Sequence, residues 1–181
     1  MSHDIRCTRS ELVQTIIQLE DLPFSLKDYA PFVDIYNVEG SSILLKTGRQ
    51  VSKTTFLANT MILDAATHRY FKDLYVAPGR NRVQDFSNTK LDILIEGSKF
   101  ISDYLVDTSK INRVFLKQFN NFSQIMLSYV DVDAERVRGI SADRVLVDEV
   151  QMVLYDEVFP VLMACMDNVI VTGKQIGRAH V

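Results

Sequence analysis

The chain has little that would mark it as secreted, membrane-spanning or held together by metal. It contains two cysteines, Cys7 and Cys165. They are too few for a disulfide framework and lack metal-ligand spacing, which favours a reducing compartment and argues against structural zinc. The amino terminus has no apolar signal-peptide core. The longest apolar run, 158–166, is interrupted by Pro160 and falls far short of the roughly 20 residues that cross a bilayer. We therefore expect a soluble protein without membrane contact.

Neither sign of charge is in large excess, since 20 Lys and Arg stand against 23 Asp and Glu, for a net charge of −3. The protein as a whole therefore does not attract a phosphate backbone. Any DNA contact must be local, transient or made by parts outside this chain. What is present is an ordinary globular composition with 47% hydrophobic residues, and a length that suits one domain with a sizeable core.

Apolar runs and turn residues alternate along most of the chain. Residues 1–40 are expected to be a lead-in segment, with a helix over 10–19 and then a stretch punctuated by Pro23 and Pro31. Beyond it, strands are predicted at 41–46, 73–78, 112–119, 123–130, 144–150 and 168–173, and helices at 53–71, 80–97 and 155–166. This alternation predicts an α/β fold, a three-layer domain with a largely parallel central sheet.

A candidate phosphate-binding turn follows the first of these strands. It consists of Thr47, Gly48, Arg49, Gln50, Val51, Ser52, Lys53, Thr54 and Thr55. Nucleotide phosphates need backbone N–H groups at a helix amino terminus, a lysine at the terminal phosphates and a hydroxyl on the magnesium ion. Lys53 and Thr54 stand in the last two of these P-loop roles, but Thr47 and Ser52 replace the two glycines of the strict pattern. A solvated helix start, capped by Ser52 or Thr54, is the alternative that this motif alone leaves open.

A second motif lies 95 residues after Lys53 (148 minus 53), where the apolar strand ends in Asp148 and Glu149. This is a Walker B arrangement. The first carboxylate can hold hydrated magnesium, and the second can orient and polarise the attacking water. Both can approach the crevice where α/β sheets bind ligands, because the strand opens into a loop. A polar strand end that begins a turn is the alternative. Together the two motifs predict nucleotide hydrolysis, with 41–175 as the P-loop ATPase core.

The string TGRQVSKTT resembles the variant P-loop of the large terminase subunits of tailed bacteriophages, in which an Arg-Gln pair lies inside the loop. The likeness extends further. Residues 74–95 look like the strand and helix that follow, and 136–151 are similar to that family's run of Arg-Gly, Walker B and catalytic Glu. NVIVTG, residues 168–173, resembles the strand that leads into the coupling motif. The ordered set of motifs is what makes the likeness specific.

The resemblance implies a role for each matching residue of the two motifs. Lys53 would bind the terminal phosphates, and Thr54, with Thr55 alongside, would help to hold magnesium. Arg49 would stabilise the charge that develops during phosphoryl transfer. Asp148 would also hold magnesium, and Glu149 would activate water.

Four further positions matter to the resemblance. Thr172 and Gly173 would couple hydrolysis to movement. Tyr29 lies in PFSLKDYAPFVDIYN, which resembles the family's adenine-contacting stretch, and would pack on the base. Ser52 departs from the pattern because its Cβ must be accommodated where the backbone approaches phosphate, which puts the rate in doubt more than the fold.

The family likeness implies an ATP-hydrolysing motor, acting in the host cell cytoplasm, that powers translocation of viral DNA into the procapsid. It implies ATP and Mg²⁺, double-stranded DNA, a portal protein, a small terminase subunit and a homo-oligomeric ring. The family's nuclease domain lies downstream of the motor, so DNA cutting is expected only of a longer protein. Two rival interpretations stay open. One is a superfamily 1 or 2 helicase, although Arg49 and Gln50 disfavour it, and the other is a nucleotide-binding assembly module without hydrolysis.

The last six residues, IGRAHV at 176–181, do not belong to the α/β pattern. They equal one translation of the start of a widely used sequencing-adapter DNA. We therefore expect them to be a non-biological extension and the motor to be carboxyl-terminally truncated. A genuine polar tail is the alternative.

Overall fold

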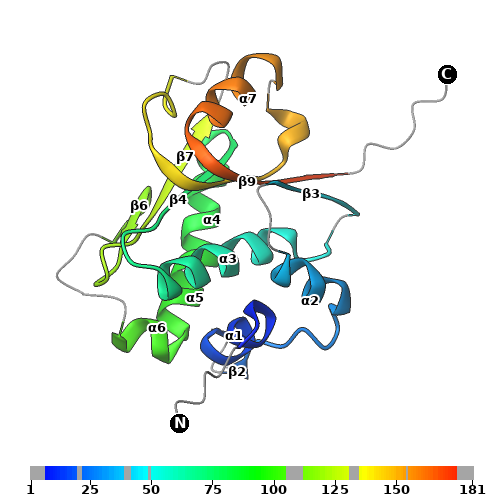
Figure 1. The fold of residues 1–181 in the computed structure, drawn as a ribbon, viewed down its shortest axis with the longest axis vertical. Helices are drawn as coiled ribbons and strands as arrows, with labels where there is room; N and C mark the ends of the chain where they lie inside the picture. The colour runs from blue at the N-terminus through cyan, green and yellow to red at the C-terminus, as the bar shows by residue number, and fades with distance from the viewer. Residues whose placement is uncertain are drawn as a thin grey trace, which may run out of the picture.

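The computed structural model describes residues 7–19, 22–38, 42–48, 50–104, 112–130, 135–153 and 155–174. Within these ranges a seven-stranded sheet carries helices on both faces (Figure 1). The predicted α/β class with a mostly parallel sheet is confirmed. The tail at 176–181 and Arg49 lie outside the described residues.

The lead-in segment folds into short elements that pack under the sheet. It forms α1 (Arg9–Ile16), a hairpin of β1 (Gln18–Leu19) and β2 (Leu22–Pro23), and α2 (Ala30–Asn37). A capping box starts α1, because Thr8 and Glu11 each accept the other's backbone N–H. The helix is shorter than predicted, since the backbone N–H of Gln18 already donates to the Ser98 hydroxyl at 2.9 Å.

The core elements follow the predicted order closely. They are β3 (Ser42–Thr47), α3 (Lys53–Thr67), β4 (Lys72–Pro78), α4 (Arg80–Phe86), the π-helix η1 (Ser87–Leu91), α5 (Asp92–Gly97), α6 (Lys99–Tyr104), β5 (Asn112–Arg113), β6 (Leu116–Gln118), β7 (Gln124–Val130), β8 (Ala142–Val147), the 3₁₀-helix η2 (Val150–Met152), α7 (Tyr155–Ala164) and β9 (Met166–Lys174). The prediction of a single strand at 112–119 is wrong, because β5 and β6 form an antiparallel hairpin there.

The sheet order places the two predicted motifs close to each other. The strands run β3-β9-β8-β4-β7-β6-β5. The first five are mutually parallel, and β6 and β5 add an antiparallel edge. Only β9 separates β3 from β8. The carboxyl ends of β3 and β8, the strands that precede the two predicted motifs, therefore lie at one edge of the sheet, where ligands bind in such folds.

Alternation along β4 shows how the sheet divides the core. Tyr75 and Ala77 pack with α1 to α5 on one face, whereas Leu74 and Val76 pack with Val158 and other residues of α7 on the other. Helix α3 is buried continuously from residue 56 to 65, between the sheet and the other helices of its face. Its first turn is therefore held firmly at the carboxyl edge. No described helix is both long and apolar enough to span a membrane.

Candidate functional site

The two predicted motifs touch at the carboxyl edge of the sheet. The Thr54 hydroxyl, in the first turn of α3, donates to Oδ2 of Asp148 at 3.1 Å, although 94 residues separate the two in sequence. Beside them Lys53 folds back over the P-loop turn, and its Nζ donates to the carbonyl of Gly48 at 2.6 Å. The turn and the acidic strand end thus form one polar site.

The P-loop turn uses left-handed backbone at positions occupied by residues other than glycine. Gln50 has φ 59°, and Ser52, which precedes α3, has φ 61° and ψ 22°. A residue with a Cβ costs about 1 kcal/mol in this region. Ser52 is therefore strained where the strict pattern has glycine. Gly48 is not sterically required, since a Cβ built there would meet no atom within 4 Å.

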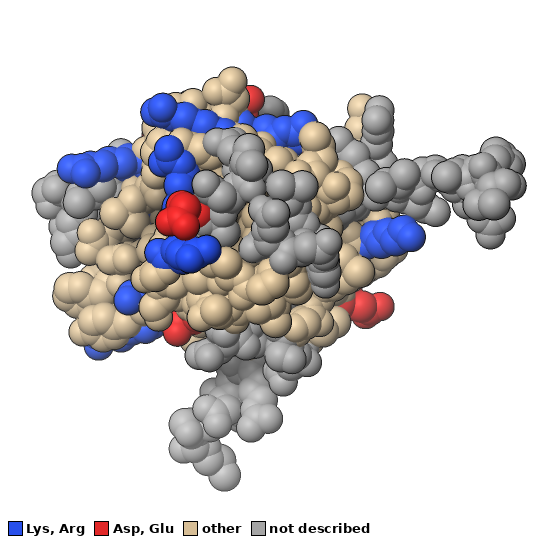
Figure 2. All heavy atoms as spheres, turned by 90° about the horizontal axis from the view of Figure 1, so that it is seen from above, with Lys and Arg blue, Asp and Glu red and all other residues tan. Residues whose placement is uncertain are grey.

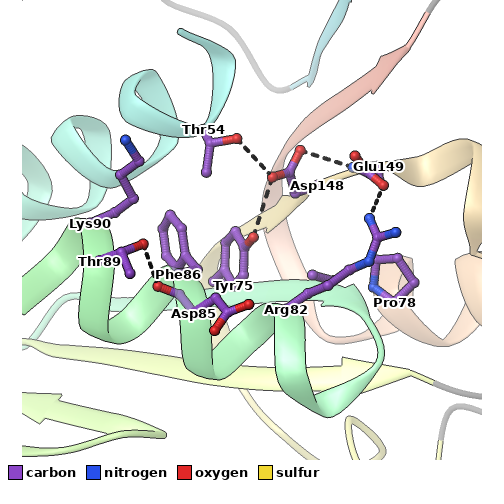
Figure 3. A pocket seen from close by; sticks show the side chains of 11 residues that line it. Thr54, Tyr75, Pro78, Arg82, Asp85, Phe86, Thr89, Lys90, Asp148 and Glu149 are labelled. Carbon is purple, nitrogen blue, oxygen red and sulfur yellow. Dashed lines mark hydrogen bonds and ion pairs between the residues drawn. The ribbon is translucent and has the colours of Figure 1, made fainter. Parts of the chain in front are cut away.

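Asp148 is the fixed centre of the site (Figure 3). It is buried, and besides Thr54 it accepts the Tyr75 hydroxyl at 3.3 Å and the backbone N–H of Glu149 at 2.9 Å. Burial raises the pKa of Tyr75 well above its ordinary value, and the Asp148 carboxylate raises it further. The hydroxyl therefore stays protonated and donates. The Tyr75 ring stacks on Phe86 at a centroid distance of 3.9 Å, which fixes the donor in place.

Glu149 reaches the same pocket because the backbone turns at this residue. Neighbouring side chains on a strand face opposite ways. At Glu149, however, the chain leaves β8 in the left-handed conformation, with φ 51° and ψ 46°. Its carboxylate forms an ion pair with Arg82, in the first turn of α4 (Figure 3). Sequence reasoning missed Arg82. The available signal was its place shortly after strand 73–78, whose carboxyl end lies at the same edge.

A pocket of about 250 Å³ opens beside the acid pair, between the first turn of α3, the end of β4 and the helix that continues from α4 into η1. The polar side chains in its lining come from Thr54, Tyr75, Arg82, Asp85, Thr89, Lys90 and Glu149, together with Asp148. The π-helix carries two of them, Thr89 and Lys90. Cations, hydroxyls and carboxylates thus converge on one cavity, a lining that suits a metal-bound polyphosphate.

The other predicted residues lie around this site. Thr172 and Gly173 pair with Leu45 and Lys46 of β3, directly after Val171, which pairs with Val147. Their backbone therefore lies between the P-loop strand and the acid pair. Thr47 ends β3, and Val51 and Thr55 are half-buried around the start of α3.

Tyr29 stands immediately before α2, with 38% of its surface exposed. The Tyr29 and Phe32 rings form an edge-to-face pair with their centres 6.4 Å apart. The centre of the Phe32 ring is 5.6 Å from that of Phe56, which follows closely after Lys53. Two ring contacts thus connect Tyr29 to the beginning of α3. Of the predicted site residues, Arg49 alone falls outside the described part of the chain.

Comparison with known proteins identifies relatives of this architecture. Residues 33–164 match the family model of the phage terminase large subunit gpA, ATPase domain. The crystal structure of the HK97 bacteriophage large terminase is 14% identical with a TM-score of 0.66, and the match covers 93% of this chain and 38% of that one. The ATPase domain of the Thermus phage P74-26 large terminase is 14% identical with a TM-score of 0.55, covering 79% and 63%. A mutant of that domain is 12% identical with a TM-score of 0.57, covering 77% and 62%.

These structural matches are too low in identity to show more than the fold. The chain spans less than two thirds of each matched structure. A search of curated protein sequences finds no match. The family model, in contrast, covers more than half of the chain and includes the P-loop, the acid pair and the strands between them. The chain therefore belongs to the family of phage terminase large subunit gpA ATPase domains.

Proposed function

We propose that this chain binds ATP with magnesium at the carboxyl edge of its sheet and hydrolyses it to move viral DNA into a procapsid. The family implies ATP hydrolysis by a DNA-packaging motor. The observation that carries the assignment to these residues is the 3.1 Å hydrogen bond between Thr54 and Asp148. It joins the P-loop helix to the acidic strand end, as a shared metal and phosphate site requires.

The residues present fit a magnesium ion. The Thr54 hydroxyl and the Asp148 carboxylate offer two oxygen atoms within hydrogen-bond distance, the donor chemistry that magnesium prefers. They would hold the ion, which when bound neutralises charge on the phosphate oxygens. Backbone N–H groups of residues 50–54, at the start of α3, would face the phosphates. The Lys53 ammonium group would leave the Gly48 carbonyl and bind the terminal phosphates instead. Arg49 would add a second positive charge from within the loop.

Glu149 would act as the general base. Water attacks the terminal phosphorus, its proton passes to the Glu149 carboxylate, and the bond to the ADP oxygen breaks. Arg82 would keep this carboxylate directed into the pocket through the ion pair. Tyr75 would orient Asp148 through its hydroxyl, without contacting the reacting atoms.

The remaining predicted residues complete the proposal. Tyr29 would pack on adenine, since two ring contacts link it to the start of α3. Thr172 and Gly173 would couple hydrolysis to movement from their place between β3 and the acid pair. In this division, residues 1–40 supply the base contact and 41–175 the motor core. Portal protein, small terminase subunit, ring assembly and residence in the host cytoplasm are proposed for the longer protein.

Turnover measurements on three variants test the enzymatic assignment. We expect magnesium-dependent ATP hydrolysis by the chain, lowered about 100- to 10,000-fold in Glu149→Gln by loss of the general base. Lys53→Ala should lose nucleotide binding as well as hydrolysis. Titration with a fluorescent ATP analogue measures the binding. Lys46→Ala, at an exposed lysine of β3, is the matched control and should behave like the unaltered chain. Equal, negligible rates in all four proteins would contradict hydrolysis, and binding without turnover would favour an assembly module.

A further inference from the structure

A strip of two neighbouring aromatic rings with an arginine at each end lies on the same side of the molecule as the sheet's antiparallel edge. Arg80, the first residue of α4, has its Cζ 5.7 Å from the centre of the Phe115 ring. The centre of the Phe115 ring is 6.3 Å from the centre of the Tyr129 ring of β7. The centre of the Tyr129 ring is in turn 4.5 Å from the Cζ of Arg136. The two rings are half-buried and both arginines are exposed. We call these four residues the arginine–aromatic strip.

The strip lies within a local concentration of positive charge. In the view from above, several Lys and Arg side chains lie near one another on the left of the molecule (Figure 2). Two more arginines, Arg82 and Arg138, follow the strip's own arginines by two residues each, although Arg82 forms an ion pair with Glu149 and Arg138 is paired with Glu135 at 3.4 Å. With a net charge of −3 for the chain, this concentration is a property of one region and not of the whole surface.

The rings hold the guanidinium groups in place. A ring beneath a guanidinium covers one of its faces and leaves the N–H edge to meet a partner, and an arginine fixed in this way loses less freedom on binding. The planar fork of N–H donors matches a phosphate group. An array of fixed arginines therefore suits a polymer that carries phosphates at regular spacing.

From this geometry we propose that the arginine–aromatic strip binds the phosphate backbone of double-stranded DNA. The inference rests on the proposed function, because a packaging motor must hold the DNA that it moves. A duplex fits better than a single strand, because both rings are half-buried and each already has an arginine over it, which leaves less ring surface for bases to stack on. A protein partner fits less well, since the exposed part of the strip is cationic, whereas the centres of protein interfaces are depleted in charge.

DNA binding measured by fluorescence anisotropy, with a labelled blunt duplex at several salt concentrations, tests the proposal. The double variant Arg80→Gln/Arg136→Gln should weaken binding on the order of tenfold or more at low salt. The slope of log Kobs against log salt should become about 1.8 less negative, since each phosphate that the protein no longer neutralises accounts for about 0.9.

The matched control is Arg69→Gln/Lys72→Gln, beside the amino-terminal end of β4. It removes the same charge, and Arg69 also lies over a tyrosine, with its Cζ 5.5 Å from the Tyr70 ring. Affinity and slope should stay near those of the unaltered chain. Equal losses in the two double variants would overturn the proposal, because binding would then follow net charge and not this strip.

The supporting ring provides a second test. Tyr129→Leu removes the ring under Arg136 and should weaken duplex binding about two- to fivefold, whereas Tyr129→Phe should not. Absence of duplex binding at low salt, or single-stranded DNA bound equally well with the same dependence on Arg80 and Arg136, overturns the proposal. So does self-association that needs these arginines while DNA affinity is unchanged. Titration with the fluorescent ATP analogue separates the outcomes, since intact nucleotide binding without DNA binding leaves the proposed ATPase standing.

Discussion

The two ends of the same parallel strands carry acidic residues in opposite settings. At the carboxyl edge, Asp148 and Glu149 line a pocket, and their partners are hydroxyls, an N–H group and the half-exposed Arg82. At the amino edge, Asp73 of β4 and Asp64 near the end of α3 are buried, and neither lines that pocket. Acids at one edge remain open to a ligand, and those at the other are enclosed by protein.

Two arginines compensate the charge of Asp64 at the amino edge. One oxygen of the Asp64 carboxylate is 2.7 Å from Arg9 of α1, and the other forms an ion pair with Arg144 of β8. Asp73 has no hydrogen-bond partner for either carboxylate oxygen among the described residues. Burial, and then the charge of Asp64, raises the pKa of Asp73 well above its ordinary value. An acidic residue near the end of a strand therefore indicates a binding or catalytic role only where the fold leaves its carboxylate accessible to a ligand.

The same substitution at the two edges should have different effects on stability. Asp64→Asn removes the shared partner of Arg9 and Arg144, which leaves two largely enclosed positive charges, and should lower the free energy of unfolding by about 3 kcal/mol. Asp148→Asn keeps an oxygen that can accept from the Thr54 and Tyr75 hydroxyls. It should therefore change the free energy of unfolding by only about 1 kcal/mol. Reversible urea unfolding at neutral pH measures both. A larger loss for Asp148→Asn would show that the carboxyl edge also depends on its charge for stability.

Asp73 should make the amino edge sensitive to pH. Because its pKa is raised in the folded state, folding favours the protonated form, so stability falls as pH rises from the unfolded-state value through the folded-state value. Each unit of difference corresponds to about 1.4 kcal/mol. Asp73→Asn should abolish this fall and be more stable than the unaltered chain at neutral pH, but not below pH of about 4. Unfolding curves across this pH range measure the effect, and parallel pH profiles for the two proteins would contradict it.

Much of the carboxyl edge could be predicted because its signals are local in sequence. Lys53 and Thr54 follow one apolar strand, and Asp148 and Glu149 end another, so each motif shows its own element and its place on it. The parallel arrangement of the strands also follows from their alternation with helices. What the sequence could not show depends on contacts between distant residues. Arg82 can pair with Glu149 because α4 begins beside the carboxyl end of β8. The two residues are 67 positions apart in the sequence.

Two errors in the predicted fold have similar causes. Apolar residues run through 112–119 as they would in one strand, but a turn between β5 and β6 folds this segment into a hairpin on β7. The π-helix at 87–91 lies inside a helical pattern that looks regular in sequence. In both places tertiary packing determines the backbone conformation, which cannot be predicted from the spacing of hydrophobic residues.

Ser52 allows the test with the smallest expected effect, because its backbone is strained in the turn that we propose to bind phosphate. Ser52→Gly removes the left-handed penalty of about 1 kcal/mol, but glycine's freedom in the unfolded chain offsets most of it. The free energy of unfolding should therefore change by about 0.5 kcal/mol or less. ATP affinity should rise several-fold, since the Cβ no longer stands where phosphate approaches the backbone. Titration with the fluorescent ATP analogue measures this rise. Ser52→Ala keeps the Cβ and loses only the hydroxyl, so an equal rise in affinity for the alanine and glycine variants would show that the hydroxyl, and not the Cβ, limits nucleotide binding.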